Sequence, residues 1–579
     1  MKKFFKILFN HKWAIAMAIL IGVIITSPHV YFQITQKDFY KGIAFGGTSD
    51  EVVFLMRIQE VRDGHYLIAN NSWAEGKDLP YLAPPLAENI TSFTGQIFGL
   101  NLIDTITLDR FLFPAFVFLL IYVLIYQFTK RKSISLIASV TVLLSINLIN
   151  PIRVWNLFFY KQTYADFMLF SRLISPIHLI FFFGFLLLFW FFLQKKQWAY
   201  GIFSGILLGL SFYEYPYTWT FLFAFLGCLI LIFLYKKEWT KIKDIILIII
   251  IALLVAVPYF WNLWRAIHHP LYPELTSRFG LIKTHNPQVG ALVLILLAIF
   301  LLFFSRKQKD RYCFCLGLVL TPLVVLNQQI ITGMIMIPDH YHWYFHGPLM
   351  IIFIIIIFFE LLERKINNLT LRRIIFSSLI ILILFINFYN AWVIQTSFYE
   401  RQEPIAIENQ RYGVIFEWLR NNTQKDEVII VDEISSYLIP IYTSLNTVNC
   451  DDGRHSLVAD EKEILERSFL IFRLNGLKGE NEILYNYFFK NKIIISWKFY
   501  GEYYRKQMGG YEFIPDEKLY FLVNEYREFL NIPLENILKK YHTDYLLWDT
   551  LKDPQWKIEQ YPFFEQIYEI NEFKVFKLK

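Results

Sequence analysis

The sequence is poor in charged residues and in cysteine, and each shortage excludes a class of protein. Only 18% of its 579 residues are charged, whereas soluble globular domains carry about 25%. Of the four cysteines, Cys228, Cys313 and Cys315 fall within apolar runs and only Cys450 lies in the C-terminal region. A disulfide scaffold is therefore excluded. The C-terminal region also has no phosphate-binding glycine loop and no nucleophile elbow.

What the chain has in abundance is apolar surface. Hydrophobic residues make up 55% of the sequence and aromatic residues 19%, a surface that a bilayer solvates and water does not. The formal net charge is +7, but the basic residues stand in short clusters between apolar runs. That pattern is typical of membrane orientation signals. We therefore reject a nucleic-acid partner and expect membrane lipids around the chain.

The apolar runs predict a polytopic α-helical membrane protein with about eleven transmembrane helices. The first run follows four lysines, is long and lacks a small-x-small cleavage site, so we interpret it as an uncleaved signal anchor. The expected spans are 13–33, 111–128, 133–150, 173–193, 198–213, 217–235, 244–262, 289–305, 312–331, 346–361 and 374–395. The apolar segment that follows Pro84–Pro85 and ends at Gly99 contains polar residues, so we place it on the membrane surface or only partly inserted.

Alternate loops are basic, which predicts the orientation. The clusters lie at 130–132, 195–196, 236–243, 306–311 and 364–373. With eleven spans, all five and the N-terminus share one side, and the positive-inside rule makes that side cytoplasmic. We expect the chain in the plasma membrane, that is, the inner membrane of the cell. The first loop, 34–110, should then lie on the outer side. Of the twelve histidines, only His11 is expected on the cytoplasmic side.

The composition changes near Ser397, so we expect a transmembrane domain over 1–397 and an extracytoplasmic α/β domain over 398–579. Short apolar runs predict strands and amphipathic runs predict helices. The expected strands are 428–431, 545–548 and 573–578, and the expected helices are 412–419 and 530–541. Without a catalytic motif, this domain is interpreted as a scaffold or binding module.

The first outer loop carries the most informative motif, the acidic pair Asp50-Glu51. Thr48 and Glu51 are spaced as a capping box, and Gly64 suits a helix C-cap, so a short helix should begin near Ser49. Helical spacing places Asp50 and Arg57 on one face. A purely structural interpretation also stands, in which Glu51 caps the helix and Asp50 complements its dipole.

Several features in this order resemble the GT-C superfamily of membrane glycosyltransferases, nearest to the protein O-mannosyltransferase and lipid A aminoarabinose transferase branch. They are the acidic pair after the first span, the helix ending at Gly64, the run from Pro80 to Leu86, then Phe98-Gly99 and Arg110. The resemblance covers about the first 130 residues and the overall topology. It implies a polyprenyl-phosphate-linked sugar donor, an outward-facing site and an inverting transfer, with Asp50 and Glu51 at the positions that match the acidic residue serving as catalytic base.

One departure affects the substrate. Aminoarabinose transferases carry a lysine directly before the Pro-Pro-Leu sequence, and this chain has Ala83 there. The sugar of those enzymes is therefore not carried over. The acceptor stays open between a glycan, a lipid and a protein.

Glycosyl transfer from a lipid phosphate needs a base near the acceptor hydroxyl and cationic or metal stabilisation of the leaving phosphate. Arg172 abuts an expected span where a lipid headgroup would lie, and Arg57 shares the helix face of Asp50. Other candidates are Arg153, Lys161 and Asp166 in the second outer loop, and Arg265, Arg278, His268 and His269 in a later one. The alternatives are a snorkelling interfacial anchor for Arg172 and solvated charges in the later loop.

The stretch from Ile337 to His346 is the densest polar and aromatic cluster. His342 and His346 are four residues apart, so a helix would place them on one face. Asp339, His340, His342 and His346 together are candidates for holding a divalent metal ion, the one cofactor considered. The three histidines are also candidates for donor phosphate binding, or they are interfacial histidines in an aromatic belt. Glu214, in a short outer turn, is a further substrate-binding candidate.

These features therefore predict a glycosyltransferase with Asp50 as base, with Glu51 either positioning Asp50 or supporting a metal ion, and with Arg172 and the 340–346 cluster receiving the phosphate. Two alternatives remain. A transporter or lipid flippase would place ionisable residues within the spans and often has inverted repeats, whereas these spans are nearly free of charge and no repeat is evident. A non-catalytic relative would act by binding a partner through its C-terminal domain.

Overall fold

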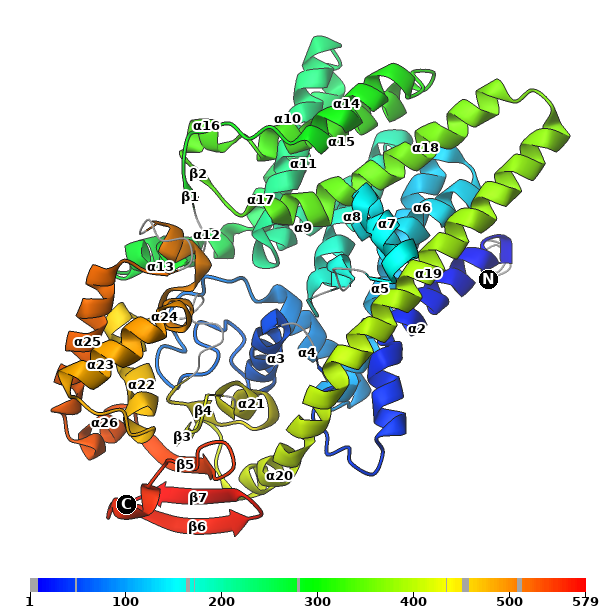
Figure 1. Cartoon of the computed structure of the whole chain (residues 1–579). Helices are drawn as coiled ribbons and strands as arrows, with labels where there is room; N and C mark the ends of the chain where they lie inside the picture. Colours follow the sequence, from blue (N-terminus) through cyan, green and yellow to red (C-terminus); the bar gives the residue numbers. More distant parts are fainter. Residues whose placement is uncertain are drawn as a thin grey trace.

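The chain has a large apolar helical part and a smaller C-terminal part built around a sheet (Figure 1). The computed structural model describes residues 9–46, 49–162, 167–170, 172–278, 282–433, 435–449, 458–507 and 513–579. The N-terminus lies in the apolar part and the C-terminus in the sheet, and the long helix α19 (Leu369–Asn409) connects the two parts.

Within the described ranges, eight helical segments are long and apolar enough to cross a membrane. They are α2 (Lys12–Thr35), α5 (Leu102–Thr129), α6 with η1 (Lys132–Ile149), α8 (Ser175–Lys195), α10 (Pro216–Tyr235), Lys309–Thr332, Pro338–Lys365 and Leu369–Asn422. A ninth candidate is the pair α11 (Trp239–Val255) and α12 (Val257–Ile267), bent by 57°. Two shorter apolar helices, Trp198–Tyr213 and α14 (Ala291–Phe303), occupy the remaining expected positions. The predicted polytopic helical fold is confirmed.

The second span differs from the prediction at its start. Helix α5 begins at Leu102, nine residues before the expected residue 111, which is about two and a half helical turns. Asn101 causes the early start, because its side-chain oxygen accepts a hydrogen bond from the backbone N–H of Asp104 at 2.9 Å and so caps the helix. Asp109 and Arg110 therefore belong to the helix rather than to the loop before it.

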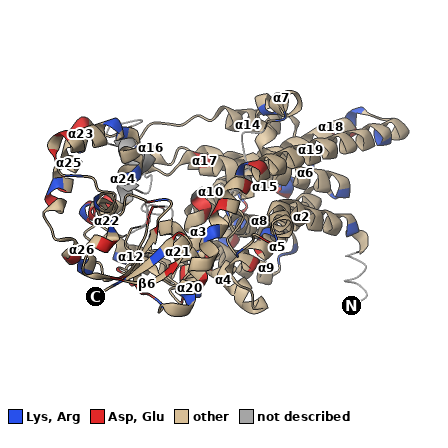
Figure 2. Cartoon of the chain, turned by 60° about the horizontal axis from the view of Figure 1, so that its bottom comes forward, with Lys and Arg blue, Asp and Glu red and all other residues tan. Residues whose placement is uncertain are grey.

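The five basic loops meet at one end of the helical part. Polar contacts connect each basic loop to another one or to the N-terminal helix. The connecting pairs are Arg131 with Glu363, Lys132 with the carbonyl of Asn10, Lys196 with Asp244, Lys241 with Asp310, and Arg311 with Glu360. Figure 2 shows charged residues at helix ends and in the C-terminal part, with the long helices between largely free of them. The shared side that the sequence predicts for these loops is thus present in space.

The C-terminal sheet has the strand order β4-β3-β5-β7-β6. Its strands are β3 (Val428–Ile430), β4 (Asn446–Thr447), β5 (Thr543–Asp549), β6 (Phe564–Ile570) and β7 (Phe573–Leu578). The two strands beside β3 run parallel to it, and β7 lies between β5 and β6 and runs antiparallel to both. The three predicted strands are confirmed, and β4 and β6 were not predicted.

Helices surround this sheet. They are α20 (Gly413–Asn422), α21 (Ser435–Tyr442), α22 (Glu461–Leu474), α23 (Asn481–Lys490), α24 (Lys492–Gln507), α25 (Asp516–Leu530) and α26 (Leu534–Lys540). The helix expected over 530–541 is instead split between α25 and α26. Pro533 separates them, because a helix usually ends before a proline.

The first outer loop packs into the C-terminal part rather than standing apart from it. The backbone N–H of Thr447 donates to the carbonyl of Ser72 at 2.7 Å, which extends the sheet edge toward the loop. Arg467 pairs with Glu75 at 2.8 Å, and its guanidinium lies 3.9 Å from the centre of the Trp73 ring. Helix α19 also continues through residue 397 without a break. The C-terminal residues and the first loop therefore share one core, and that core holds the loop that carries Asp50.

Three helices outside the long spans expose aromatic faces. They are α4 (Leu86–Phe98), α7 (Pro151–Tyr160) and α12. Their exposed aromatic side chains are Phe93 and Phe98, Trp155 and Phe159, and Trp261 and Trp264. The apolar segment that follows Pro84–Pro85 forms α4, and Gly99 ends it with a left-handed φ of 64°. Amphipathic helices with exposed aromatics favour the plane of a membrane interface.

Candidate functional site

Helix α3 (Ser49–Arg62) carries Asp50 in its first turn, close to the predicted start. The expected C-cap is Gly64, whose φ is +98°, and the N–H of the following residue reaches back to the carbonyl of Glu60 at 3.0 Å. That geometry is the usual end of an α-helix at glycine. Thr48, the other half of the expected capping box, lies outside the described residues.

Asp50 forms an ion pair with Arg172, 122 residues away in the sequence. The Asp50 Oδ2 atom accepts hydrogen bonds from Arg172 Nε at 2.8 Å and from Nη2 at 2.7 Å. The Asp50 side chain is 51% exposed and the Arg172 side chain 25%. Burial works to lower the pKa of Arg172, but Tyr344, Tyr215 and Asp50 together raise it. The guanidinium therefore stays charged while the carboxylate remains reachable from outside.

A wall of tyrosine and histidine stands beside this ion pair. Tyr215, which precedes α10, shares a hydrogen bond between its hydroxyl and Nδ1 of His340 in α17 (Pro338–Tyr341). Tyr344, in the single π-helical turn η4 (His342–His346), shares a hydrogen bond with Ser175 Oγ at 3.2 Å. The charges of Arg172 and Asp50 both reach His340. Three elements distant in the sequence thus meet at one point.

A buried histidine–glutamate pair lies behind the wall. Nδ1 of His178 contacts Oε1 of Glu214, and both side chains are almost completely buried. The His178 ring stacks on the Tyr215 ring, with centroids 3.9 Å apart and planes 5° apart. Thr218 Oγ1 donates to Glu214 at 3.4 Å. The pair therefore fixes the orientation of Tyr215, and through it that of His340.

His178 and Tyr344 were not predicted as site residues. A signal for His178 is present in the sequence, because it stands in the otherwise apolar run of α8, and an ionisable residue within a span is a functional candidate by default. Tyr344 lies within the stretch from Ile337 to His346 that the sequence analysis singles out, but nothing distinguishes it there from the neighbouring aromatic residues. Among the predicted residues, the structure brings together Asp50, Arg172, Glu214 and His340.

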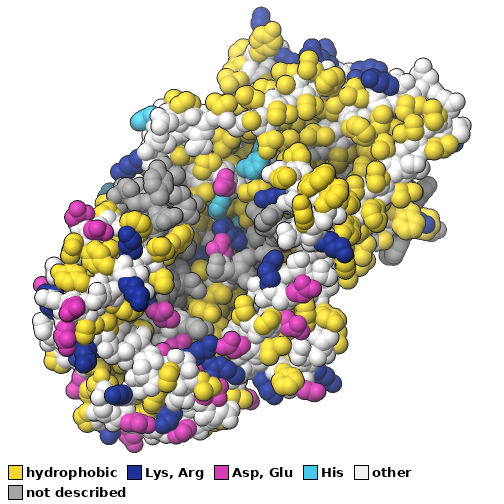
Figure 3. Space-filling model, in the orientation of Figure 1, with side chains coloured by type: hydrophobic (Ala, Val, Ile, Leu, Met, Phe, Trp, Pro, Cys, Tyr) yellow, Lys and Arg dark blue, Asp and Glu magenta, His cyan; other side chains and the backbone are white. Residues whose placement is uncertain are grey.

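The arrangement brings several reactive and hydrogen-bonding groups together. It has an accessible carboxylate, a fixed guanidinium, hydroxyl donors and an imidazole. In Figure 3, acidic, basic and histidine side chains gather in a hollow between the apolar helices and the C-terminal part. A guanidinium with nearby hydroxyls suits phosphate oxygens, and an accessible carboxylate suits proton abstraction from a hydroxyl.

Glu51 and Arg57 serve other contacts. Glu51 is buried and pairs with Arg110, which also donates to His29 in α2. Arg57 pairs with Glu88 of α4, with Nε 2.5 Å from Oε1, and donates to the carbonyl of Ala83 at 3.1 Å. Both pairs fasten α3 to its neighbours, and neither side chain points into the Asp50 cluster.

The four residues considered for a metal ion do not converge. His342 and His346 meet each other, as their spacing predicts, with Nδ1 atoms 3.3 Å apart. His340 instead engages Tyr215, and the Asp339 side chain is exposed. In the part of the chain that the structure describes, no three His, Cys, Asp or Glu residues form a group able to hold a metal ion.

The other candidate charges are also placed elsewhere. The Arg153 guanidinium lies over the Trp343 ring at 5.5 Å. Arg265 donates to the carbonyl of Asp78 at 3.0 Å, which holds the first outer loop against α12. His268 and His269 make local contacts at the end of α12, and Lys161 is an exposed residue after α7. Asp166 and the side chain of Arg278 lie outside the described residues.

The Arg57–Glu88 pair gives a stability prediction. Both side chains are almost fully buried, so Glu88→Ala leaves the guanidinium buried without its charge partner. Breaking a buried pair from one side costs about 3–5 kcal/mol. We expect a clear fall in melting temperature of the purified protein. Asp104→Ala is the control, because its carboxylate is exposed and should change stability by less than about 1 kcal/mol. Equal effects of the two substitutions would contradict the structural role of Glu88.

Neither a family model nor a curated protein matches the sequence. Three solved structures are similar in fold. An apo oligosaccharyltransferase from Archaeoglobus fulgidus shares 12% identity, with 93% of this chain and 69% of that chain covered, at a TM-score of 0.45. ArnT from Cupriavidus metallidurans, bound to undecaprenyl phosphate, shares 10% identity, with 98% of each chain covered, at a TM-score of 0.45.

The third is the archaeal oligosaccharyltransferase AglB from Archaeoglobus fulgidus, in complex with an inhibitory peptide and a dolichol-phosphate. It shares 13% identity, with 94% of this chain and 70% of that chain covered, at a TM-score of 0.41. The chain is thus similar to these proteins along most of its length and at about one identical residue in ten.

Proposed function

We propose that this chain is a glycosyltransferase that moves a sugar from a polyprenyl-phosphate donor to an acceptor hydroxyl at the outer face of the plasma membrane. The observation that carries the proposal is the Asp50–Arg172 ion pair beside the Tyr215–His340 wall. The pair places a carboxylate and a guanidinium at the edge of an apolar helical bundle, where a lipid-borne phosphate can approach from the membrane.

Asp50 acts as the base in this proposal. Its carboxylate takes the proton of the acceptor hydroxyl while the acceptor oxygen attacks the anomeric carbon. The bond between that carbon and the phosphate oxygen breaks, and the polyprenyl phosphate leaves with the electron pair. Because attack and departure occur on opposite faces of the carbon, the configuration inverts. The half-exposed side chain of Asp50 leaves room for an acceptor.

Arg172 receives the phosphate. In the resting protein its two N–H groups donate to Asp50, and the donor phosphate would compete for the same groups. Donor binding thereby weakens the hydrogen bonds from Arg172 to Asp50. The base thus becomes free when the donor, which carries the leaving group, is bound. Charge-assisted hydrogen bonds from a guanidinium to phosphate are among the strongest available, and the hydroxyl of Tyr215 adds a further donor.

The distribution of basic loops supports the proposed outward position of the site. The basic loops lie together at the end of the bundle where α5 ends and α6 begins, and Arg131 pairs there with Glu363. Asp50 and Arg172 belong to connections at the other ends of the same helices. Since positively charged loops stay cytoplasmic, the site faces outward. The N-terminus is then cytoplasmic and the C-terminal part extracytoplasmic.

The direct test compares cell-envelope glycans from cells that carry the native chain and cells that carry Asp50→Asn, by mass analysis. We expect one sugar to disappear from one glycan, lipid or protein in the variant, which would name both the sugar and the acceptor. An unchanged envelope, with the variant present at normal level in the membrane, would overturn the proposal.

One observation favours a second function, transport or flipping of a lipid. The His178–Glu214 pair is buried within the bundle, and transporters use such intramembrane ionisable groups. Vesicles that contain the purified protein distinguish the two. Movement of a labelled polyprenyl-linked sugar across the membrane, without glycosyl transfer, would favour transport, and product formation without movement would favour transfer.

Within the transferase proposal, Glu214 is a positioning residue. Glu214→Gln removes the negative charge that His178 faces, so Tyr215 and His340 lose their fixed orientation. A misplacement of about 1 Å costs roughly 100-fold in rate, and we expect kcat to fall by that order with the KM for donor changed less. The measurement is turnover of donor sugar by the purified protein.

Thr218→Val is the matched control for Glu214→Gln. It removes only the 3.4 Å hydrogen bond to Glu214 and keeps the contact with His178, so we expect less than about a threefold change in kcat, equivalent to a weak hydrogen bond. If both variants reduce turnover equally, Glu214 supports the packing of the helices rather than the orientation of the site.

A further inference from the structure

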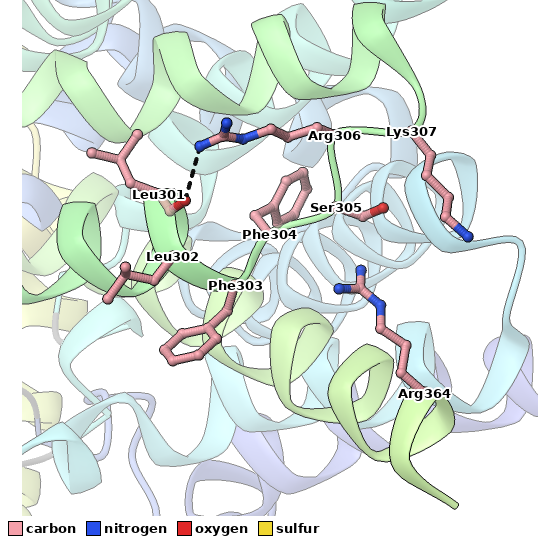
Figure 4. A pocket seen from close by; sticks show the side chains of 8 residues that line it. All are labelled: Leu301, Leu302, Phe303, Phe304, Ser305, Arg306, Lys307 and Arg364. Atoms are coloured by element: carbon pink, nitrogen blue, oxygen red, sulfur yellow. Dashed lines mark hydrogen bonds between the residues drawn. The ribbon is translucent and has the colours of Figure 1, made fainter. Parts of the chain in front are cut away.

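A pocket of about 570 Å³ opens at the basic end of the bundle, opposite the Asp50 site. The end of α14, the residues that follow it and the last turn of α18 (Gly347–Lys365) form it (Figure 4). Its lining is Leu301, Leu302, Phe303, Phe304, Ser305, Arg306, Lys307 and Arg364. One side of the pocket is therefore apolar and the other carries three cations.

The apolar side faces outward from the bundle. Leu301, Leu302 and Phe303 are all exposed, and Leu302 is exposed to 74%. They continue the outer face of α14, where Leu294 and Ile295 are also exposed. Such a face on an apolar helix of a membrane protein borders the hydrocarbon of the bilayer. The pocket thus opens where acyl chains lie rather than into water alone.

The cationic side keeps unmatched charge. Arg306 donates to the carbonyl of Leu301 at 3.2 Å, which neutralises nothing. Lys307 has no carboxylate partner among the residues that the structure describes. Arg364 reaches Glu360 only at 3.5 Å, while Arg311 holds the same glutamate at 2.5 Å. Figure 4 shows Arg306, Lys307 and Arg364 around one opening. The pocket therefore lacks an anion.

We propose that this pocket binds the phosphodiester headgroup of an anionic phospholipid from the cytoplasmic leaflet. The headgroup phosphate sits between Arg306, Lys307 and Arg364, and an acyl chain runs along Leu302 and Phe303. Basic pockets between helices on the cytoplasmic side suit such headgroups, and guanidinium groups bind phosphate with paired hydrogen bonds. This site is separate from the proposed transfer reaction, whose phosphate binds at the other end of the bundle.

The combination of surfaces selects a lipid over a soluble anion. A soluble phosphate would gain the three cations but would leave Leu301, Leu302 and Phe303 uncovered. A phospholipid satisfies both sides, since burial of apolar surface contributes about 25 cal/mol per Å². The bound lipid would also tie the end of α14 to that of α18, because the pocket takes side chains from both segments.

The test measures lipid binding to the full-length protein in detergent by native mass spectrometry, with phosphatidylglycerol and phosphatidylcholine as probes. We expect tighter binding of phosphatidylglycerol, and about 30-fold weaker binding in the double variant Arg306→Gln with Lys307→Gln, because each cation near an anionic lipid contributes about 1 kcal/mol. The control is Lys195→Gln with Lys237→Gln, which removes the same charge from exposed lysines in other basic loops and should change binding by less than about threefold.

Three results would overturn the proposal. They are equal binding of the two lipids, equal loss in the test and control variants, and displacement of the lipid by millimolar inorganic phosphate, which would identify a site for soluble anions. Arg364→Gln provides an independent substitution on the other segment, with about fivefold weaker binding expected from one lost cation. Unchanged binding in this folded variant would also contradict the site.

Discussion

Asp50→Asn is expected to lower kcat for sugar transfer by about 10²–10⁴-fold, the usual contribution of a positioned base. The amide keeps the size of the side chain and can still accept a hydrogen bond, but it cannot take the proton of the acceptor hydroxyl. The Asp50–Arg172 pair is partly exposed, and such pairs contribute about 0–1 kcal/mol to stability. The variant should therefore fold and melt nearly as the native protein does, and turnover of purified protein is the measurement.

The neighbouring residue provides the matched control, because Glu51 also carries a carboxylate but is buried where Asp50 is exposed. It is buried and paired with Arg110, so Glu51→Gln should reduce stability by about 3–5 kcal/mol. The fraction that folds should retain a kcat close to the native value. If Glu51→Gln abolished transfer in folded protein while Asp50→Asn left it intact, Glu51 would be the base and the assignment within the pair would be reversed.

The sequence predicts the parts of this molecule that depend on local patterns. Apolar runs locate the spans, and short apolar runs locate β3, β5 and β7, because burial and periodicity are properties of neighbouring residues. Gly64 marks the end of α3 for the same reason, since its positive φ is a local requirement. The split at Pro533 also follows from a local rule, the restriction on the residue before a proline.

The contacts between distant segments could not be predicted in this way. Asp50 and Arg172 each stand out in the sequence, but nothing local indicates that their side chains meet across 122 residues. Arg57 looked equally suitable by helical spacing, and only the packing of α4 shows that Glu88 holds it. The association of the first loop with the C-terminal part could not be predicted either, because Ser72 and Thr447 pair through backbone groups that carry no sequence signal.

These long-range contacts also suggest a role for the C-terminal part. Its core includes residues of α3 such as Leu55 and Ile58 together with β3 and β5. The helix that carries Asp50 is thus held between the apolar bundle and the C-terminal sheet. The scaffold role of the domain stays a prediction, and this packing supports it, because movement of the sheet relative to the bundle would move Asp50 relative to Arg172.

Arg172→Ala is the second substitution with a large expected effect. Removing one fixed hydrogen-bond donor to a developing negative charge lowers kcat by about 10²–10³-fold. The loss of the ionic contact between the guanidinium and the phosphate should also raise the KM for the sugar donor. Arg172→Lys should fall between the native protein and Arg172→Ala, because lysine keeps the charge and loses the paired N–H geometry. Turnover at several donor concentrations separates the two effects. An Arg172→Ala protein with native kcat and KM would remove Arg172 from the phosphate site.

Binding of the product polyprenyl phosphate distinguishes this mechanism from a purely structural ion pair. If the phosphate competes with Asp50 for Arg172, then Asp50→Asn frees the guanidinium and should tighten phosphate binding, while Arg172→Ala should weaken it. The double variant should bind as weakly as Arg172→Ala alone, because without the guanidinium there is nothing left to compete for. If the pair only supports the fold, both single variants should weaken binding together and in proportion to their loss of stability. The opposite signs in one assay would therefore show that the leaving group and the base share Arg172.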